Sequence, residues 1–153
     1  MGETTQQVLI REANSSDIDR IYEIGTLCFT DAWRKETVAH DLGDNHSSWY
    51  IVAEVDGDVV GYGCFWFVAD EGQLVNIGVH PSFRRRKLGE LLLQKGIEEA
   101  QNRQMKTMFL EVRVSNIPAQ QMYEKFGFQN LGLRKKVYEL PIEDGYVMEI
   151  KIQ

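Results

Sequence analysis

The sequence has few of the features that mark several large classes of protein. It contains two cysteines, Cys28 and Cys64, which lie inside apolar stretches and lack the spacing of metal ligands. We therefore expect buried, reduced thiols instead of a disulfide framework or a zinc site. No stretch reaches the roughly 18 apolar residues of a membrane span, and residues 1–7 are too polar for a signal peptide. Repeats and low-complexity blocks are missing as well. A cytoplasmic protein is the expectation.

Charge and composition narrow the partners that we expect. The 153 residues are enough to bury one core, so we expect a single domain over residues 1–153. Acidic residues outnumber basic ones, and the formal net charge is −6. This excess argues against direct binding of nucleic acid and is compatible with a basic or amine-bearing partner, because opposite charges speed encounter.

The pattern of apolar residues predicts hairpins first and strand–helix alternation afterwards. Asn14 is expected to cap the first helix, with Asp17 at its third position, and Asp56-Gly57 supplies a hairpin turn. We expect helices at residues 15–28, 34–42, 88–102 and 117–127, and strands at residues 7–13, 49–55, 59–68, 73–80, 106–114, 128–138 and 146–152. This order indicates an α+β (α/β) fold, a mixed central sheet of six or seven strands with about four helices on its faces.

Four consecutive cations, residues 84–87, separate a strand from the helix that begins at Leu88. By charge alone they would be a solvated surface patch. Cations at a helix N-terminus oppose the helix dipole, however, and an anion held by the first-turn amides would offset that cost. Gly89 would let such an anion approach the backbone. We therefore favour a phosphate-bearing ligand, although the segment has neither the Walker pattern nor a dinucleotide fingerprint.

The same segment resembles the coenzyme A loop of the GNAT family of N-acetyltransferases. The family pattern is Gln/Arg-x-x-Gly-x-Gly/Ala, and residues 84–89 read Arg-Arg-Arg-Lys-Leu-Gly, with Lys87 in place of the first glycine. The likeness covers nearly the whole chain and is strongest to the ribosomal-protein-alanine N-acetyltransferase branch. It rests on CFTDAWRKET (28–37), LVNIGVHPSFRRRKLGELLL (74–93), FLEVRVSNIPAQQMYEKFGF (109–128) and YELPIEDGYVM (138–148).

The resemblance implies a GNAT fold and acetyl-CoA as cosubstrate, without a metal. The strand before the loop would contact the pantetheine arm, and the loop would contact the phosphates. The implied cofactor-binding residues are Ile77, Gly78, Val79, Arg85, Arg86, Lys87, Leu88, Gly89, Glu90 and Asn116. If the position of Lys87 requires a positive φ, a lysine there carries a strain cost of about 1 kcal/mol or more.

Two residues of the third matching segment have catalytic roles in the family. By residue type, Glu111 on its apolar strand is either paired with a cation such as Arg113 or poised for proton transfer; the resemblance implies the general base. By spacing, Tyr123 is a core tyrosine on a helix that Asn116 caps; the resemblance implies the general acid that protonates the coenzyme A thiolate.

The resemblance also implies a substrate side of the site, made by Trp33, Tyr138, Glu143 and Asp144. By residue type alone, Glu143-Asp144 is equally an acidic receptor for a basic peptide or a turn before the last strand. In these substrate-side segments the chain departs from the branch at three positions, Ala32, Val137 and Gly145.

The expected activity is acetyl transfer to the N-terminal α-amine of a basic protein, a small-subunit ribosomal protein by the resemblance, with no membrane partner. Two alternatives remain open. The first keeps the fold and moves the acceptor to a lysine, a polyamine or another small amine. The second is a non-catalytic domain that senses acyl-CoA, which Glu111 and Tyr123 disfavour because a pure binder needs no acid–base pair. The sequence predicts no oligomeric state.

Overall fold

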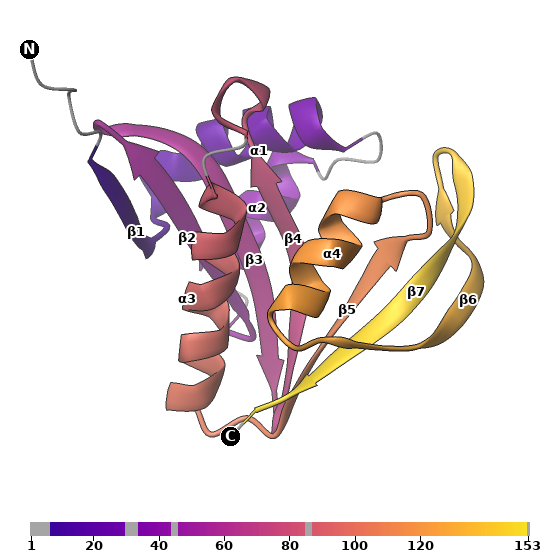
Figure 1. Ribbon diagram of the computed structural model, residues 1–153. Coiled ribbons are helices and arrows are strands. Elements are labelled where there is room, and N and C mark those ends of the chain that lie inside the picture. The colour runs from indigo at the N-terminus through magenta and orange to yellow at the C-terminus, as the bar shows by residue number, and fades with distance from the viewer. Residues whose placement is uncertain (1–6, 30–33, 44–45, 85–86, 153) are drawn as a thin grey trace, which may run out of the picture.

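The computed structural model describes residues 7–29, 34–43, 46–84 and 87–152. Within these residues the chain forms seven strands and four α-helices, arranged as Figure 1 shows. The strands are β1 (Val8–Glu12), β2 (Ser48–Val55), β3 (Asp58–Val68), β4 (Glu71–Val79), β5 (Thr107–Arg113), β6 (Gln129–Glu139) and β7 (Ile142–Lys151). The α-helices are α1 (Ile18–Cys28), α2 (Lys35–Gly43), α3 (Leu88–Asn102) and α4 (Ile117–Lys125), and short 3-10 helices span Ser15–Asp17 and Pro81–Phe83.

The described strands form one sheet in the order β1-β2-β3-β4-β5-β7-β6. Neighbouring strands run antiparallel except β4 and β5, which are parallel and pair only from Glu71↔Thr107 to Gln73↔Phe109. Beyond those residues β4 and β5 diverge (Figure 1). The expected mixed sheet of six or seven strands with about four helices is confirmed.

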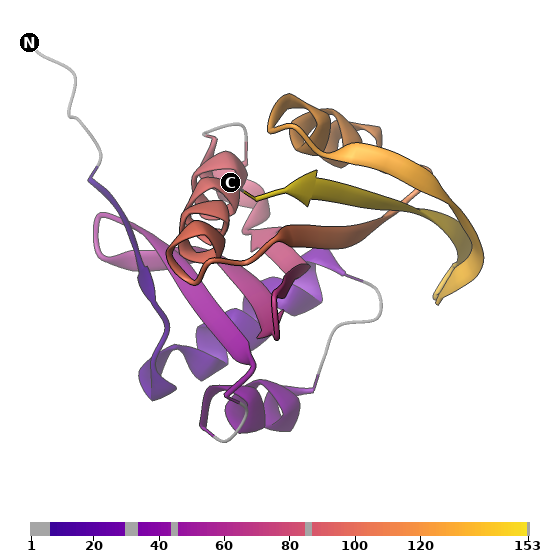
Figure 2. The same ribbon diagram turned by 90° about the horizontal axis from the view of Figure 1, so that it is seen from below.

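Different helices cover the two faces of the sheet (Figure 2). On one face α3 and α4 pack over the larger core, which includes Phe65, Leu92, Leu93, Met108 and Tyr123. On the other face α1 and α2 cover the half of the sheet that holds β1–β4, and Ile21 and Ile24 of α1 pack there against Tyr50, Val52 and Tyr62. Each face therefore presents a different set of side chains to the point where β4 and β5 part.

The alternation of side chains along β5 decides which residues lie on which face. Met108, Leu110 and Val112 are buried in the core under α3 and α4. The intervening Phe109, Glu111 and Arg113 point to the opposite face, the one that carries α1 and α2. The alternation of apolar residues in FLEVRV (109–114) predicts the same division, with Glu111 on the face opposite Leu110 and Val112.

Local sequence signals explain where several helices begin and end. Asn14 and Asp17 form a reciprocal capping box, and the chain makes a 3-10 turn before α1 instead of entering the α-helix directly. The structure confirms the predicted bounds of α3, residues 88–102. Gly127, with a φ of 105°, follows α4 in the left-handed conformation that ends many helices.

The start of the last strand differs from its sequence prediction. Glu143-Asp144 was one candidate for a turn before this strand, but β7 already begins at Ile142, and the chain reverses at Leu140-Pro141 instead. A Cβ at Gly145 would lie 2.8 Å from Val137 Cγ2. Glycine is needed at this position because a neighbouring side chain crosses the strand there, and not because the chain turns.

Candidate active site

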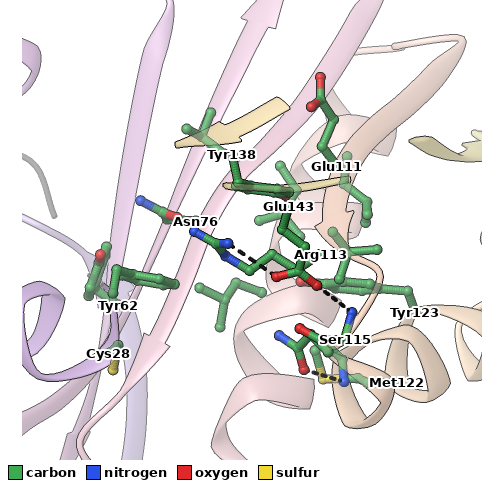
Figure 3. A pocket seen from close by; sticks show the side chains of 18 of the residues that line it. Cys28, Tyr62, Asn76, Glu111, Arg113, Ser115, Met122, Tyr123, Tyr138 and Glu143 are labelled. Atoms are coloured by element: carbon green, nitrogen blue, oxygen red, sulfur yellow. Dashed lines mark hydrogen bonds and ion pairs between the residues drawn. The ribbon is translucent and has the colours of Figure 1, made fainter. Parts of the chain in front are cut away.

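A cleft of about 590 Å³ opens where β4 and β5 diverge (Figure 3). Its walls come from β4, β5 and α4, and from the hairpin that joins β6 to β7. The lining side chains are those of Cys28, Phe29, Tyr62, Leu74, Val75, Asn76, Ile77, Leu110, Glu111, Val112, Arg113, Ser115, Asn116, Ala119, Met122, Tyr123, Tyr138, Pro141 and Glu143. Six residues that were predicted from the sequence meet at this one cleft: Ile77, Glu111, Asn116, Tyr123, Tyr138 and Glu143.

An irregularity in β4 contributes to the opening. Cys64 pairs with Asn76 and Phe65 with Leu74, so Val75 is an extra residue without a partner on β3. Such a bulge bends its strand and turns backbone groups away from the ladder. Val75 and the two residues that follow it, Asn76 and Ile77, line the cleft. The bulge and the end of β4–β5 pairing therefore act together to open a slot through the sheet.

Glu111 approaches the cleft from the face that carries α1 and α2. Its carboxylate accepts a hydrogen bond from the Arg134 guanidinium on β6. The Glu111 side chain is 33% exposed and that of Arg134 is 58% exposed, so the pair is open to water and weak. The alternative that paired Glu111 with Arg113 is wrong in its partner, because Arg113 binds the β6–β7 hairpin.

Arg113 holds that hairpin against β5. Its Nη1 donates to Glu143 Oε1 at 3.1 Å and its Nη2 donates to the Leu140 carbonyl at 3.1 Å. The guanidinium also lies 4.3 Å from the centre of the Tyr138 ring. The backbone N–H of Ser115 donates to Glu143 Oε2 at 2.8 Å. Hydrogen bonding by Ser115, first through its side chain and then through its backbone, followed by Arg113, lowers the pKa of Glu143. Glu143 is therefore an ionised structural link in the cleft wall.

The other predicted substrate-side residues have different positions. Asp144 lies in β7 and not in a turn, and its Oδ1 accepts a bond of 2.8 Å from the backbone N–H of Lys136. Asp144 is not among the cleft residues, whereas Tyr138 is. Trp33 lies outside the described residues. Both carboxylates of Glu143-Asp144 thus bind groups of the protein itself.

Tyr123 reaches the cleft from α4, on the other face of the sheet from Glu111. Its ring packs 5.8 Å from the ring of Phe128, and the residue is 9% exposed. Burial, with a smaller effect from Tyr138, raises the pKa of Tyr123 above its ordinary value of 10. The hydroxyl therefore stays protonated at neutral pH. In Figure 3 the Glu111 carboxylate points away from the Tyr123 ring, so the two groups bound the cleft on opposite sides.

Asn116 begins α4 as the sequence predicted. Its Oδ1 accepts a hydrogen bond of 3.2 Å from the Ala119 N–H, and both residues line the cleft. Gln120 adds support, because its Nε2 donates to the carbonyls of Arg113 and Val114 at 3.0 Å each. The cap and the amide together fix α4, and with it Tyr123, to the end of β5.

In the loop before α3, Lys87 has the positive φ that the family pattern of a glycine at this position suggested. Lys87 has a φ of 60°, in the left-handed region that glycine prefers, and it is the N-cap of α3. Arg85 and Arg86 lie outside the described residues. Leu88 is buried, and the Glu90 carboxylate binds Lys125 of α4 at 3.0 Å. The first turn of α3 is thus tied to α4 beside the cleft.

Gly89 lies on the cleft side of that first turn. A Cβ added there would meet only Met122 Sδ at 3.6 Å and Ile77 Cγ2 at 3.9 Å among described atoms. The protein itself therefore has room for a side chain, and both neighbours line the cleft. A helix N-terminus with a bare backbone at the end of a slot fits a phosphate group whose arm enters the slot. The residues present fit coenzyme A.

Gly78 and Val79, two of the residues predicted to contact the pantetheine arm of coenzyme A, do not line the cleft directly. Gly78 packs on Tyr62, since an added Cβ would be 2.8 Å from Tyr62 Cε1, and the Val79 carbonyl accepts from Cys28 Sγ at 3.3 Å. Ile77 lines the cleft, but Gly78 and Val79 do not.

Four further residues at the cleft were not predicted from the sequence. Asn76, Ser115 and Met122 line it, and Arg134 binds Glu111. Asn76 could have been found as the one amide inside the apolar run LVNIGV. Arg134 gave no signal, because its pairing with Glu111 arises from the β6–β7 hairpin.

Comparisons with known proteins agree with this geometry. The model of the acetyltransferase (GNAT) family matches residues 18–128. A Bacillus subtilis (strain 168) protein, whose name proposes a [ribosomal protein bS18]-alanine N-acetyltransferase, is 40% identical over 94% of this chain and 95% of its own. The [ribosomal protein bS18]-alanine N-acetyltransferase of Escherichia coli (strain K12) is 31% identical over 89% of each chain.

A solved structure extends the likeness to the fold. The crystal structure of the ribosomal-protein-S18-alanine N-acetyltransferase from Escherichia coli superposes with a TM-score of 0.88 and 29% identity, covering 96% of this chain and 95% of that one. Among the described residues, no helix is both long and apolar enough to cross a membrane. From the family match and these relatives together, we conclude that the chain belongs to the GNAT family of acetyltransferases.

Proposed function

We propose that the protein transfers the acetyl group of acetyl-CoA to a protein N-terminal α-amine, and that the acceptor is the N-terminal alanine of a small-subunit ribosomal protein. One observation carries the chemistry: Glu111 and Tyr123 reach one cleft from opposite faces of the sheet. The acceptor is supported by two relatives, the Escherichia coli enzyme and the Bacillus subtilis protein, whose names specify ribosomal protein bS18. Such an acceptor would place the reaction in the cytoplasm.

The donor would lie along β4 and the first turn of α3. Amides of Leu88, Gly89 and Glu90, with the cations before them, would hold its phosphates, and Ile77 and Asn116 would contact its arm. The donor supplies an activated acetyl thioester, whose carbonyl the amine attacks. Everything else is positioning and proton transfer by the protein.

Glu111 would accept the proton of the attacking amine. A protein α-amine has a pKa of about 7.7–8.0, so about a tenth is already neutral at pH 7 and a mild base suffices. A lysine amine, with a pKa of about 10.4, would demand far more of the same carboxylate. Since Arg134 binds Glu111 in the structure, the acceptor amine must compete with that guanidinium.

Tyr123 would assist the departing thiolate from the other face. A thiol has a pKa of about 8.5, below that of an ordinary tyrosine, so complete proton transfer is uphill by about 2 kcal/mol. Burial raises the pKa of Tyr123 further and makes complete transfer costlier still. Its contribution is therefore a hydrogen bond that strengthens as negative charge grows on the sulfur.

The test is acetylation of a panel of acceptors by the purified protein. Peptides that begin with alanine should be acetylated on the α-amine, located by mass spectrometry, and much faster than lysine side chains or polyamines. Preference for a lysine or polyamine would replace this function with the small-amine alternative. Binding of acetyl-CoA without transfer to any amine would support the acyl-CoA sensor.

A further inference from the structure

A second, smaller hollow of about 110 Å³ lies beside the cleft. Its lining consists of Trp66 and Val68 from β3, Glu71, Gly72 and Gln73 from β4, and Phe109 from β5. Trp66 is 38% exposed and Val68 is 57% exposed, which is unusual for large apolar side chains on a sheet face. The hollow has no part in the chemistry of Glu111 and Tyr123.

The sheet register places the hollow on the same face as Glu111. Trp66 pairs with Gln73, and Gln73 with Phe109, so these three side chains stand side by side on adjacent strands. Phe109 and Glu111 are two residues apart on β5 and point to the same face. Their Cα atoms are therefore separated by about 6.5–7 Å. An extended acceptor whose amine lies at Glu111 covers that distance within two residues.

The lining chemistry suits a cationic side chain. An exposed indole ring is the best aromatic partner for a guanidinium or ammonium. Beside it, the Glu71 carboxylate is exposed and has no ion pair with any other described residue. Two nearby carboxylates are already paired, Asp70 with Lys106 and Glu149 with Lys151. The charge of Glu71 is thus the one left available at the rim.

We propose that this hollow binds a cationic side chain of the acceptor, at the second or third residue behind the acetylated amine. This inference rests on the proposed function and deepens it by naming the class of residue at those positions. An apolar side chain would fill the space between Trp66 and Phe109, but it would desolvate the Glu71 carboxylate and the Gln73 amide without a partner. A cation satisfies both the rings and the carboxylate.

Matched peptides provide the test. Hexapeptides that begin with alanine and carry either arginine or citrulline, its neutral isostere, at position 2 or at position 3 are compared by kcat/KM. At one of the two positions we expect about a 3- to 30-fold preference for arginine, expressed mainly in KM. The preference should fall about two- to fivefold in Glu71→Gln and nearly vanish in Trp66→Leu. Asp58→Asn removes an exposed charge at the start of β3, far along the strand from Trp66, and should keep the full preference.

Each outcome separates the claims. Equal kcat/KM for arginine and citrulline peptides at both positions, with robust acetylation, overturns the cationic subsite and leaves the proposed function intact. A preference that survives in both Glu71→Gln and Trp66→Leu, with thermal midpoints showing both variants folded, overturns it too. If the parent acetylates lysine or polyamine but no alanine peptide, the proposed function fails and the subsite fails with it.

Discussion

The carboxylate of Glu111 on β5 accepts a hydrogen bond from the guanidinium of Arg134 on β6, and Glu111 is one of the residues that line the cleft. A cationic amine that approaches Glu111 therefore meets a cation already in place. The pair is largely open to water, so a substrate can break it at a cost of about 0.2–1 kcal/mol.

Replacing Arg134 should consequently favour the acceptor. We expect Arg134→Met to lower KM for an alanine peptide by up to about fivefold, because the competing cation is gone. Lys135→Met, which removes the neighbouring exposed cation on the same strand, is the matched control and should change KM less. Steady-state kinetics at low salt measure both. A lower kcat without any gain in KM would show instead that Arg134 orients Glu111.

The role of Glu111 as a base predicts a pH-dependent rescue. In Glu111→Gln, kcat/KM for an alanine peptide should approach that of the parent as the pH rises from 6.5 to 9.5. The neutral α-amine fraction climbs over this range from below a tenth to nearly all. A lysine acceptor would stay mostly protonated, so the variant would remain impaired on it. A low, flat ratio on the alanine peptide, with cofactor binding intact, would assign Glu111 to gripping the acceptor.

Tyr123→Phe keeps the ring that packs on Phe128 and removes only the hydroxyl. We expect kcat to fall by about 10²–10³-fold, the loss that follows removal of one hydrogen-bond donor to a developing negative charge, with a nearly unchanged Kd for coenzyme A. Tyr146→Phe removes a hydroxyl outside the cleft and should leave kcat near that of the parent. Unaltered turnover in Tyr123→Phe, with a lower thermal midpoint, would make Tyr123 a core residue only.

Lys87 has both a strained backbone conformation and a positive charge. Two substitutions distinguish the effect of the backbone from the effect of the charge. Lys87→Gly should raise the free energy of unfolding by at most about 1 kcal/mol, because glycine adopts a φ of 60° without strain. Both Lys87→Gly and Lys87→Met should weaken coenzyme A binding severalfold at low salt and reduce its salt dependence. Calorimetric titration and thermal unfolding give the two quantities. Salt-independent binding by the parent would rule out the phosphate role of the loop.

Glu143 predicts an acid-sensitive hairpin. Its pKa is lowered in the folded protein, so its stabilising effect is complete above the ordinary carboxyl value of 4.5 and is lost as the pH falls through the lowered one. The parent should lose stability with acid over this window more steeply than Glu143→Gln. At neutral pH the variant should raise KM for the acceptor more than it lowers kcat, since the hairpin wall loosens. Thermal midpoints between pH 3 and 7 follow the first effect.

The parts of the site that depend on local sequence patterns could be predicted from the sequence. The alternation in FLEVRV predicted that Glu111 faces away from the core. The asparagine at position 116 predicted the N-cap of α4. Prediction failed where partners come from distant strands. Nothing near Glu111 in the chain indicates Arg134. Glu143-Asp144 has the composition of a turn, and the contact of Val137 with Gly145 that accompanies its place in β7 exists only after β6 and β7 pair.

The short parallel contact between β4 and β5 also divides the sheet into two halves with different proposed roles. Strands β1–β4 form one antiparallel plate, and β5–β7 form another. The proposed donor contacts belong largely to the first plate, whereas Glu111, Arg134 and the hairpin wall belong to the second. Mutations around Glu111 and in the hairpin wall can thus alter the approach of the acceptor amine without disturbing donor binding. The seam of three residue pairs, from Glu71↔Thr107 to Gln73↔Phe109, is where the two plates meet, and its exposed side chains belong to the proposed cationic subsite.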